Sequence, residues 1–307
     1  MALSVQDLFR ETHGHRHREE KAVGIGNIGR AVLVLFWIDI LWGPTLSRLM
    51  TAMLWTALWF LVSGVAGHTI EASKPSAPLP PLVLWAWERP EDLRFVDPSR
   101  TAVAYLAGTI RLSADGVVAI PRLQPLVLPE TTFVFPVVRL ETSPREPPSL
   151  SEREREEVAA AILRMARPGK YGRLQLDFDA RLSERGFYRT LIRDLRERMP
   201  ESFLSITALA SWCLADPWIT DLPIDEAVPM LFRMGTGDGE VRRSMAHEGD
   251  FRLSFCRLSV GVSTDESPPI IPSESTARTR YVFHPSSWSP SAYERASAIT
   301  AIKREMP

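Results

Sequence analysis

The stretch Leu174–Met199, LQLDFDARLSERGFYRTLIRDLRERM, carries the pattern that decides the fold. Its first five residues, LQLDF, form a short apolar run typical of a buried strand. From Glu184 to Met199, the apolar residues Phe187, Leu191 and Leu195 recur at helical spacing, which predicts an amphipathic helix. A strand followed directly by a helix is the repeating unit of α/β proteins, so the fold depends on how often this unit recurs.

Short apolar runs predict seven further strands, which gives eight in all. They are Leu82–Trp87, Ala102–Leu112, Phe133–Leu140, Leu204–Leu209, Val228–Phe232, Leu258–Val262 and Arg280–Phe283. A turn at Asp115-Gly116 and further helices at Ser151–Arg167 and Ser291–Arg304 complete the pattern. Eight strands within about 230 residues favour a (β/α)8 TIM-like barrel.

This α/β barrel is expected to be irregular. The connection Ser267–Ser275 is too rich in proline for a full helix, so we expect some helices of the outer layer to be missing. An open, doubly wound sheet is the alternative architecture. It is less favoured because no glycine-rich phosphate loop follows any early strand.

Composition and charge exclude several broad classes of protein. With 45% hydrophobic and 24% charged residues, the chain is globular rather than disordered or fibrous. A net charge of -1 gives no reason to expect nucleic acid as a partner. Cys213 and Cys256 are the only cysteines, which is too few for a four-cysteine zinc site. Export would favour a disulfide between them but would not require one.

The N-terminal part of the chain differs in character from the rest. Residues 1–49 form an extension with a short apolar run, and residues 50–67 are apolar, uncharged and end in small residues. This second run fits a signal peptide, and it also approaches the roughly 18 residues of a membrane anchor. Residues 68–81 form a Pro/Ser-rich linker before the barrel domain at 82–307. We therefore expect an exported protein, either periplasmic or anchored in a membrane and facing outward.

The strongest candidate site lies at the end of the fourth predicted strand. Because strand side chains alternate, Gln175, Asp177 and Asp179 share one face. Two neighbouring carboxylates repel each other, which raises the proton affinity of one of them and provides an acid near neutral pH. A structural role is the alternative, in which Asp179 caps the next helix or pairs with Arg181 or Arg185, and Asp177 pairs with an arginine of the barrel.

Further polar and aromatic residues follow the other predicted strands, where barrel enzymes gather their active groups. Glu88 and Glu266 are candidates for a second catalytic carboxylate. The candidate substrate-binding residues are Trp87, Arg139, Gln175, Trp212, Arg233 and Trp288. Carboxylates, arginines and tryptophans at one rim suit a carbohydrate, although core packing is the ordinary fate of a single tryptophan. No metal ion or organic cofactor is expected.

Several segments resemble an uncharacterised bacterial family of exported proteins with a domain of unknown function. They are LWAWERPEDLRF, LQLDFDARLSERGFYRTLIRDLR, LSITALASWCLADPW, DEAVPMLFRMG and YVFHPSSW. The resemblance covers roughly Leu82 to Trp288. A more distant likeness is to TIM-barrel glycoside hydrolases, because LQLDFDA is similar to the Asp-x-Asp strand end of chitinase-like enzymes. Those enzymes carry a glutamate where this chain has Arg181, which counts against their substrate-assisted chemistry.

Three functions are compatible with these patterns. The first is an exported glycan-active hydrolase that uses the strand-end carboxylates. The second is a non-catalytic barrel domain that binds a polysaccharide or another envelope glycan. The third is a structural partner of a membrane or envelope protein, which would require a broad apolar patch over the strand ends.

Overall fold

The computed structural model describes residues 79–167, 172–266 and 278–301. The expected N-terminal extension, the signal or anchor at 50–67 and nearly all of the linker lie outside these residues. No helix within the described part of the chain is long and apolar enough to cross a membrane.

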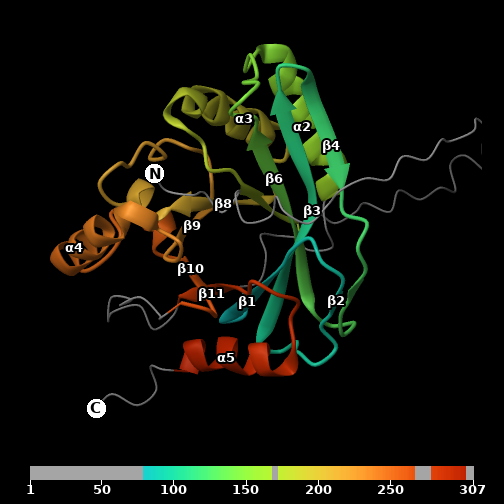
Figure 1. Ribbon diagram of the computed structural model, residues 1–307, viewed down its shortest axis with the longest axis vertical. Coiled ribbons are helices and arrows are strands. Elements are labelled where there is room, and N and C mark those ends of the chain that lie inside the picture. Colours follow the sequence, from blue (N-terminus) through green and yellow to red (C-terminus); the bar gives the residue numbers. More distant parts are fainter. Residues whose placement is uncertain (1–78, 168–171, 267–277, 302–307) are drawn as a thin grey trace, which may run out of the picture. The chain divides into compact units, whose positions relative to one another are not determined.

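Eight parallel strands close into a barrel (Figure 1). Their bounds are β1 Leu82–Ala86, β3 Thr101–Ser113, β6 Phe133–Thr142, β7 Arg173–Asp177, β8 Phe203–Leu209, β9 Glu226–Met230, β10 Ser259–Ser263 and β11 Thr279–Phe283. Each strand pairs with the next, and β1 pairs with both β3 and β11, which closes the sheet. The predicted barrel and its eight strands are therefore confirmed, and the open sheet is excluded.

A ninth strand lengthens one side of the sheet. β4, Gly116–Pro121, runs antiparallel to β3, and Ser113 pairs with Gly116 across the turn that Asp115-Gly116 predicted. Gly116 has a φ of 112°, a conformation that favours glycine. Two short strands, β2 Glu91–Asp92 and β5 Leu126–Val127, form a separate parallel pair.

The helical layer is incomplete, as expected. Its α-helices are α2 Glu152–Ala166, α3 Arg185–Arg198, α4 Asp238–Glu248 and α5 Pro290–Ala301. Short 3-10 segments are η2 Leu182–Glu184, η3 Ala210–Cys213, η4 Gly235–Gly237 and η5 Ser254–Cys256. The connections at 87–100 and 210–225 are described in full and contain no α-helix. The expected gap at Ser267–Ser275 lies outside the described residues.

Helix α2 begins where the sequence indicates. The Ser151 side chain accepts a hydrogen bond from the Glu154 backbone N–H, and Glu154 Oε2 accepts one from the Ser151 N–H at 2.8 Å. This capping box satisfies two N–H groups that the first helical turn leaves without partners. Val158 and Ile162 on the buried face of α2 then pack into the core. Figure 1 shows α2 beside β3, β4 and β6, which it contacts.

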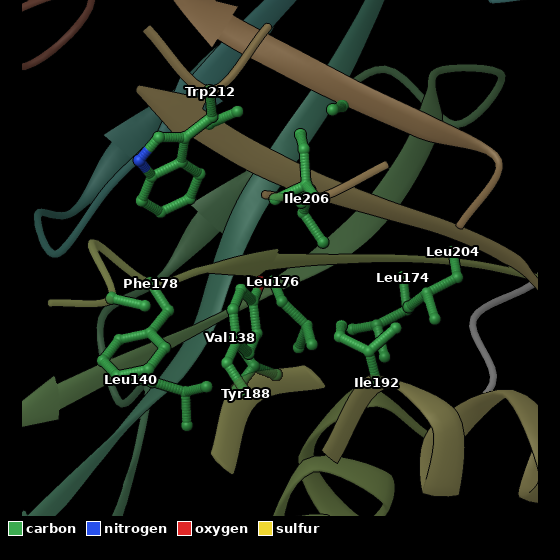
Figure 2. Close-up of a cluster of buried hydrophobic side chains, with 14 of the residues drawn as sticks. Val138, Leu140, Leu174, Leu176, Phe178, Tyr188, Ile192, Leu204, Ile206 and Trp212 are labelled. Carbon is green, nitrogen blue, oxygen red and sulfur yellow. The ribbon is translucent and has the colours of Figure 1, made fainter. Parts of the chain in front are cut away.

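The hydrophobic core lies between the outer face of the barrel and the helices. Figure 2 shows apolar side chains of β6, β7 and β8 gathered around Tyr188 and Ile192 of α3. The inward-facing residues alternate with these along each strand. They form a second interior, inside the barrel, that is much more polar, with Arg173, Gln175 and Glu226 all buried there.

A disulfide between Cys213 and Cys256 joins η3 to η5. Their Cα atoms are 6.0 Å apart, and the two residues are separated by 43 positions in sequence. The sequence alone did not decide whether this disulfide forms. It connects the loop after β8 to the segment that leads into β10.

Candidate active site

A pocket opens at the carboxyl ends of the barrel strands. The space between its lining side chains, together with the open solvent at its mouth, is about 430 Å³. Its lining residues are Trp85, Trp87, Arg139, Asp177, Asp179, Thr207, Met230, Phe232 and Phe283. The polar residues come from β6, β7 and β8 and the segment just after β7. The opposite wall, from β9 and β11, is apolar. The pocket therefore has an acidic wall, which carries Asp177 and Asp179, and an opposite aromatic wall, which carries Phe232 and Phe283.

The two carboxylates of the acidic wall differ in their surroundings. Thr207 Oγ1 donates a hydrogen bond of 2.7 Å to Asp177 Oδ1, and Arg139 Nη1 lies 3.9 Å from Asp177 Oδ2. Burial and, to a smaller extent, the Asp177 charge raise the pKa of Asp179 from 3.8 to about 6, and the Arg139 charge opposes this shift. Asp179 is therefore a carboxyl group that can hold or release a proton near neutral pH.

Arg139 is the positive charge of the pocket. Its side chain is 6% exposed, its Nε lies 3.0 Å from Glu141 Oε1, and its guanidinium lies 5.7 Å from the centre of the Trp87 ring. The same Glu141 carboxylate accepts a 3.1 Å hydrogen bond from Arg111. Because Arg139 is held between Glu141 and Asp177, it stays close to the acid pair and does not depend on a ligand for its partners.

Gln175 lies below the pocket rather than in it. It is fully buried, accepts a 2.9 Å hydrogen bond from Trp85 Nε1 and donates one of 3.0 Å to Ser205. Ser205 in turn donates to Glu226, which also accepts from Tyr281 and Arg173. This chain of hydrogen bonds fixes the Trp85 ring that lines the pocket. Gln175 thus orients a pocket residue, and its burial argues against the direct substrate contact that we expected.

Two of the expected sugar-stacking tryptophans lie in the core. Trp212 is 1% exposed and packs against Trp218 with ring centres 5.0 Å apart, and Figure 2 shows it among the buried apolar side chains. Trp288 is 6% exposed, and its indole N–H donates to the Trp85 carbonyl at 2.9 Å. Neither lines the pocket, because the segments after β8 and β11 turn these rings inward against the helical layer. Trp87 does line it.

Arg233 lies next to the pocket and supports its aromatic wall. Its guanidinium lies 5.2 Å from the centre of the Phe283 ring, and Phe283 stacks on Phe232 with ring centres 5.6 Å apart. Arg233 has a φ of 51°, which is strained for a residue other than glycine. Its N–H donates to Glu266, and its side chain donates to Asp265 at 2.7 Å. These bonds hold the strained backbone and join the ends of β9 and β10.

The two candidates for a further catalytic carboxylate lie outside the pocket lining. Glu88 is exposed, and the backbone around it is held by Arg122, which donates to the carbonyl of Arg89 at 2.5 Å. Glu266 is engaged with the Arg233 N–H. Among the described residues that line the pocket, Asp177 and Asp179 are therefore the acidic ones.

Several pocket residues were not found from the sequence, namely Thr207, Met230, Phe232 and Phe283. Thr207 lies two residues beyond Ser205, the register partner of Gln175, and therefore beside Asp177. Strand alternation indicates that Thr207 and Ser205 share one face of β8. Placing Thr207 beside Asp177 also requires the register between β7 and β8, which one sequence does not supply.

Within the ranges that the structure describes, no group of three or more histidine, cysteine, aspartate or glutamate side chains is arranged to hold a metal ion.

Comparison with known proteins gives distant structural likenesses only. No protein-family model matches it, and neither does any curated protein. A fungal endo-beta-N-acetylglucosaminidase of glycosyl hydrolase family 18 has a similar fold, with 14% identity and a TM-score of 0.47, over 74% of this chain and 99% of that one. A chitinase domain from Pyrococcus furiosus has 10% identity and a TM-score of 0.40, over 76% of this chain and 99% of that one. At this level of similarity neither protein informs the chemistry of this chain.

Proposed function

We propose that this domain is a glycan-active hydrolase in which Asp179 is the general acid. The observation that carries the proposal is the pair of neighbouring carboxylates, Asp177 and Asp179, that line a pocket at the carboxyl ends of the barrel strands. Burial and the Asp177 charge there raise the pKa of Asp179 to about 6. Few carboxyl groups keep a proton near neutral pH unless their surroundings disfavour the charge.

In the proposed reaction, the Asp179 carboxyl donates its proton to the oxygen of a glycosidic bond as that bond to the anomeric carbon breaks. The oxygen of a water molecule forms the new bond to that carbon, and the proton that this water loses returns to the Asp179 carboxylate, which restores the acid. Asp177 is the neighbouring carboxylate, and Thr207 and Arg139 fix its position. Asp177 accordingly stabilises the positive charge that develops on the sugar in the transition state.

The lining of the pocket supports a sugar as the ligand. Arg139 and Asp177 offer hydrogen-bond partners for sugar hydroxyl groups. Trp87, Phe232 and Phe283 offer apolar surface for the C–H faces of a sugar ring.

We further propose that the domain acts outside the cytoplasm. The Cys213–Cys256 disulfide supports this, because such bonds persist in oxidising compartments. The signal peptide or anchor at 50–67 stays a prediction from sequence.

The test is sugar release by the full chain from β-1,4-linked polymers of glucose and of N-acetylglucosamine. We expect Asp179→Asn to lower the rate by about 100-fold or more, since general acids contribute that much. The matched control is Glu88→Gln, an exposed carboxylate outside the pocket lining, which should keep the wild-type rate. Because the acid must be protonated, the wild-type rate should fall as pH rises through about 6. Loss of activity in Glu88→Gln instead would restore Glu88 as the second carboxylate.

A non-catalytic glycan-binding domain is the second candidate. It is favoured by the position of both pocket carboxylates at the end of β7, opposite a wall of Met230, Phe232 and Phe283 that offers no group to activate water. It predicts that the wild type binds these polymers without releasing sugar, and that Asp179→Asn still binds them. Release that depends on Asp179 would exclude it.

A further inference from the structure

Three strands extend beyond the carboxyl end of the barrel. The pairing of β1 with β3 stops at Ala86 and Tyr105, whereas β3 continues to Ser113 between β4 and β6. The added length forms a three-stranded sheet in the order β4-β3-β6. It is therefore a wall that continues the barrel on one side of the pocket.

The two faces of this wall differ in character. On the outer face, Ile110, Leu112 and Leu140 belong to the core that α2 covers. The other face, which we call the inner face, alternates with it and carries Thr109 and Arg111 of β3, Val118 and Ile120 of β4, and Arg139 and Glu141 of β6. Glu141 forms ion pairs with Arg111 and with Arg139, as expected if all three side chains lie on the inner face.

The inner face is linked to the pocket by one row of register partners. Register partners place Ile120 beside Thr109, Thr109 beside Arg139, and Arg139 beside Asp177. Since neighbouring strands lie about 4.8 Å apart, this row extends about 14 Å from the pocket carboxylate to the edge strand. Arg139 and Asp177 line the pocket themselves, whereas Thr109, between Arg139 and Ile120, is 4% exposed.

The outer part of the inner face is accessible to solvent. The side chain of Arg111 is 61% exposed, and Val118 and Ile120 are 55% and 39% exposed. Ile120 ends the row that begins at Asp177, and Val118 and Arg111 are register partners in the next row, so two exposed apolar residues lie near an exposed arginine. Polar groups that bind hydroxyls and apolar groups that contact C–H faces are what a sugar chain requires.

We propose that the inner face binds further sugar units of a polymeric glycan, one unit of which occupies the pocket. This inference rests on the proposed function and names its substrate class: a long chain held along the wall, not a short terminal sugar. Arg111 and Glu141 bind hydroxyl groups of the added units, and Val118 and Ile120 pack against their apolar faces.

The test measures the dissociation constants of the full chain for two graded series, β-1,4-linked oligomers of N-acetylglucosamine and of glucose. We expect affinity to rise with chain length by at least about tenfold in one series, which is about 1.4 kcal/mol. Arg111→Ala and Val118→Asp should remove this gain. Leu258→Asp, an equally exposed apolar position outside the inner face, should keep it. Thermal unfolding of each variant checks that the fold is retained.

The possible failures are distinguishable. Equal affinity for short and long oligomers, or an unchanged gain in Arg111→Ala and Val118→Asp, would overturn the inner face as a binding surface and leave the pocket function standing. No binding of either series at any length would overturn both proposals.

Discussion

Asp179 should make the stability of the domain depend on pH. Its pKa is raised from 3.8 to about 6 mainly by burial, so the folded state prefers the protonated carboxyl. The stability that this group contributes is present below about pH 4 and is lost as pH rises through about 6. Asparagine is uncharged at every pH. We therefore expect Asp179→Asn to gain on the order of 3 kcal/mol relative to the wild type between about pH 4 and pH 8.

Urea unfolding of both proteins across this pH range measures the difference. Asp221→Asn is the matched control, because the Asp221 side chain is 79% exposed, and we expect its stability relative to the wild type to vary little with pH. If the wild type instead became more stable than Asp179→Asn as pH rises, Asp179 would be an ordinary ionised carboxylate. The proposal that Asp179 is the general acid would then be wrong.

At the scale of elements, the eight barrel strands and the helices α2, α3 and α5 were predictable because their signals are local, whereas α4 was not predicted. The helix at 152–166 has its cap and its apolar spacing within its own sequence, and the barrel strands are short apolar runs. The candidate site was predictable only in part. Asp177 and Asp179 are found by alternation within one strand, but the environments of Trp212 and Trp288 depend on how loops fold back onto the helical layer. No local pattern distinguishes a buried tryptophan from one at a rim.

The fit between strands across the barrel interior can be tested at Gly261 of β10. A Cβ atom there would lie 3.0 Å from Cη2 and 3.4 Å from Cζ3 of Trp85, the β1 side chain that lines the pocket. Because barrel interiors are closely packed, Gly261→Ala should displace the Trp85 ring and destabilise the domain by about 1–3 kcal/mol. Chemical denaturation followed by tryptophan fluorescence measures both effects.

The matched control is Gly186→Ala in α3, where an added Cβ meets nothing within 4 Å. Alanine is the better helix former, so this variant should be unchanged or more stable by about 0.5–1 kcal/mol. A neutral Gly261→Ala with unchanged fluorescence would mean that Trp85 has room to move, and that the chain of hydrogen bonds through Gln175 does not fix it.

At the scale of the whole molecule, the Cys213–Cys256 disulfide should stabilise the domain through its effect on the unfolded chain. It closes a loop across 43 positions that contains β9 and α4, and closing a loop of this length is worth on the order of 4 kcal/mol of unfolding free energy in the chain-entropy model. Both sulfurs are buried within the core cluster, so the double variant Cys213→Ala/Cys256→Ala keeps an apolar environment while losing the bond. We expect it to lose about 2–4 kcal/mol in urea unfolding, and the wild type to lose a similar amount when reduced. The double variant itself should not respond to reductant, which controls for other effects of the reagent. Equal stability of the oxidised and reduced wild type would remove the disulfide as a reason to place this domain in an oxidising compartment.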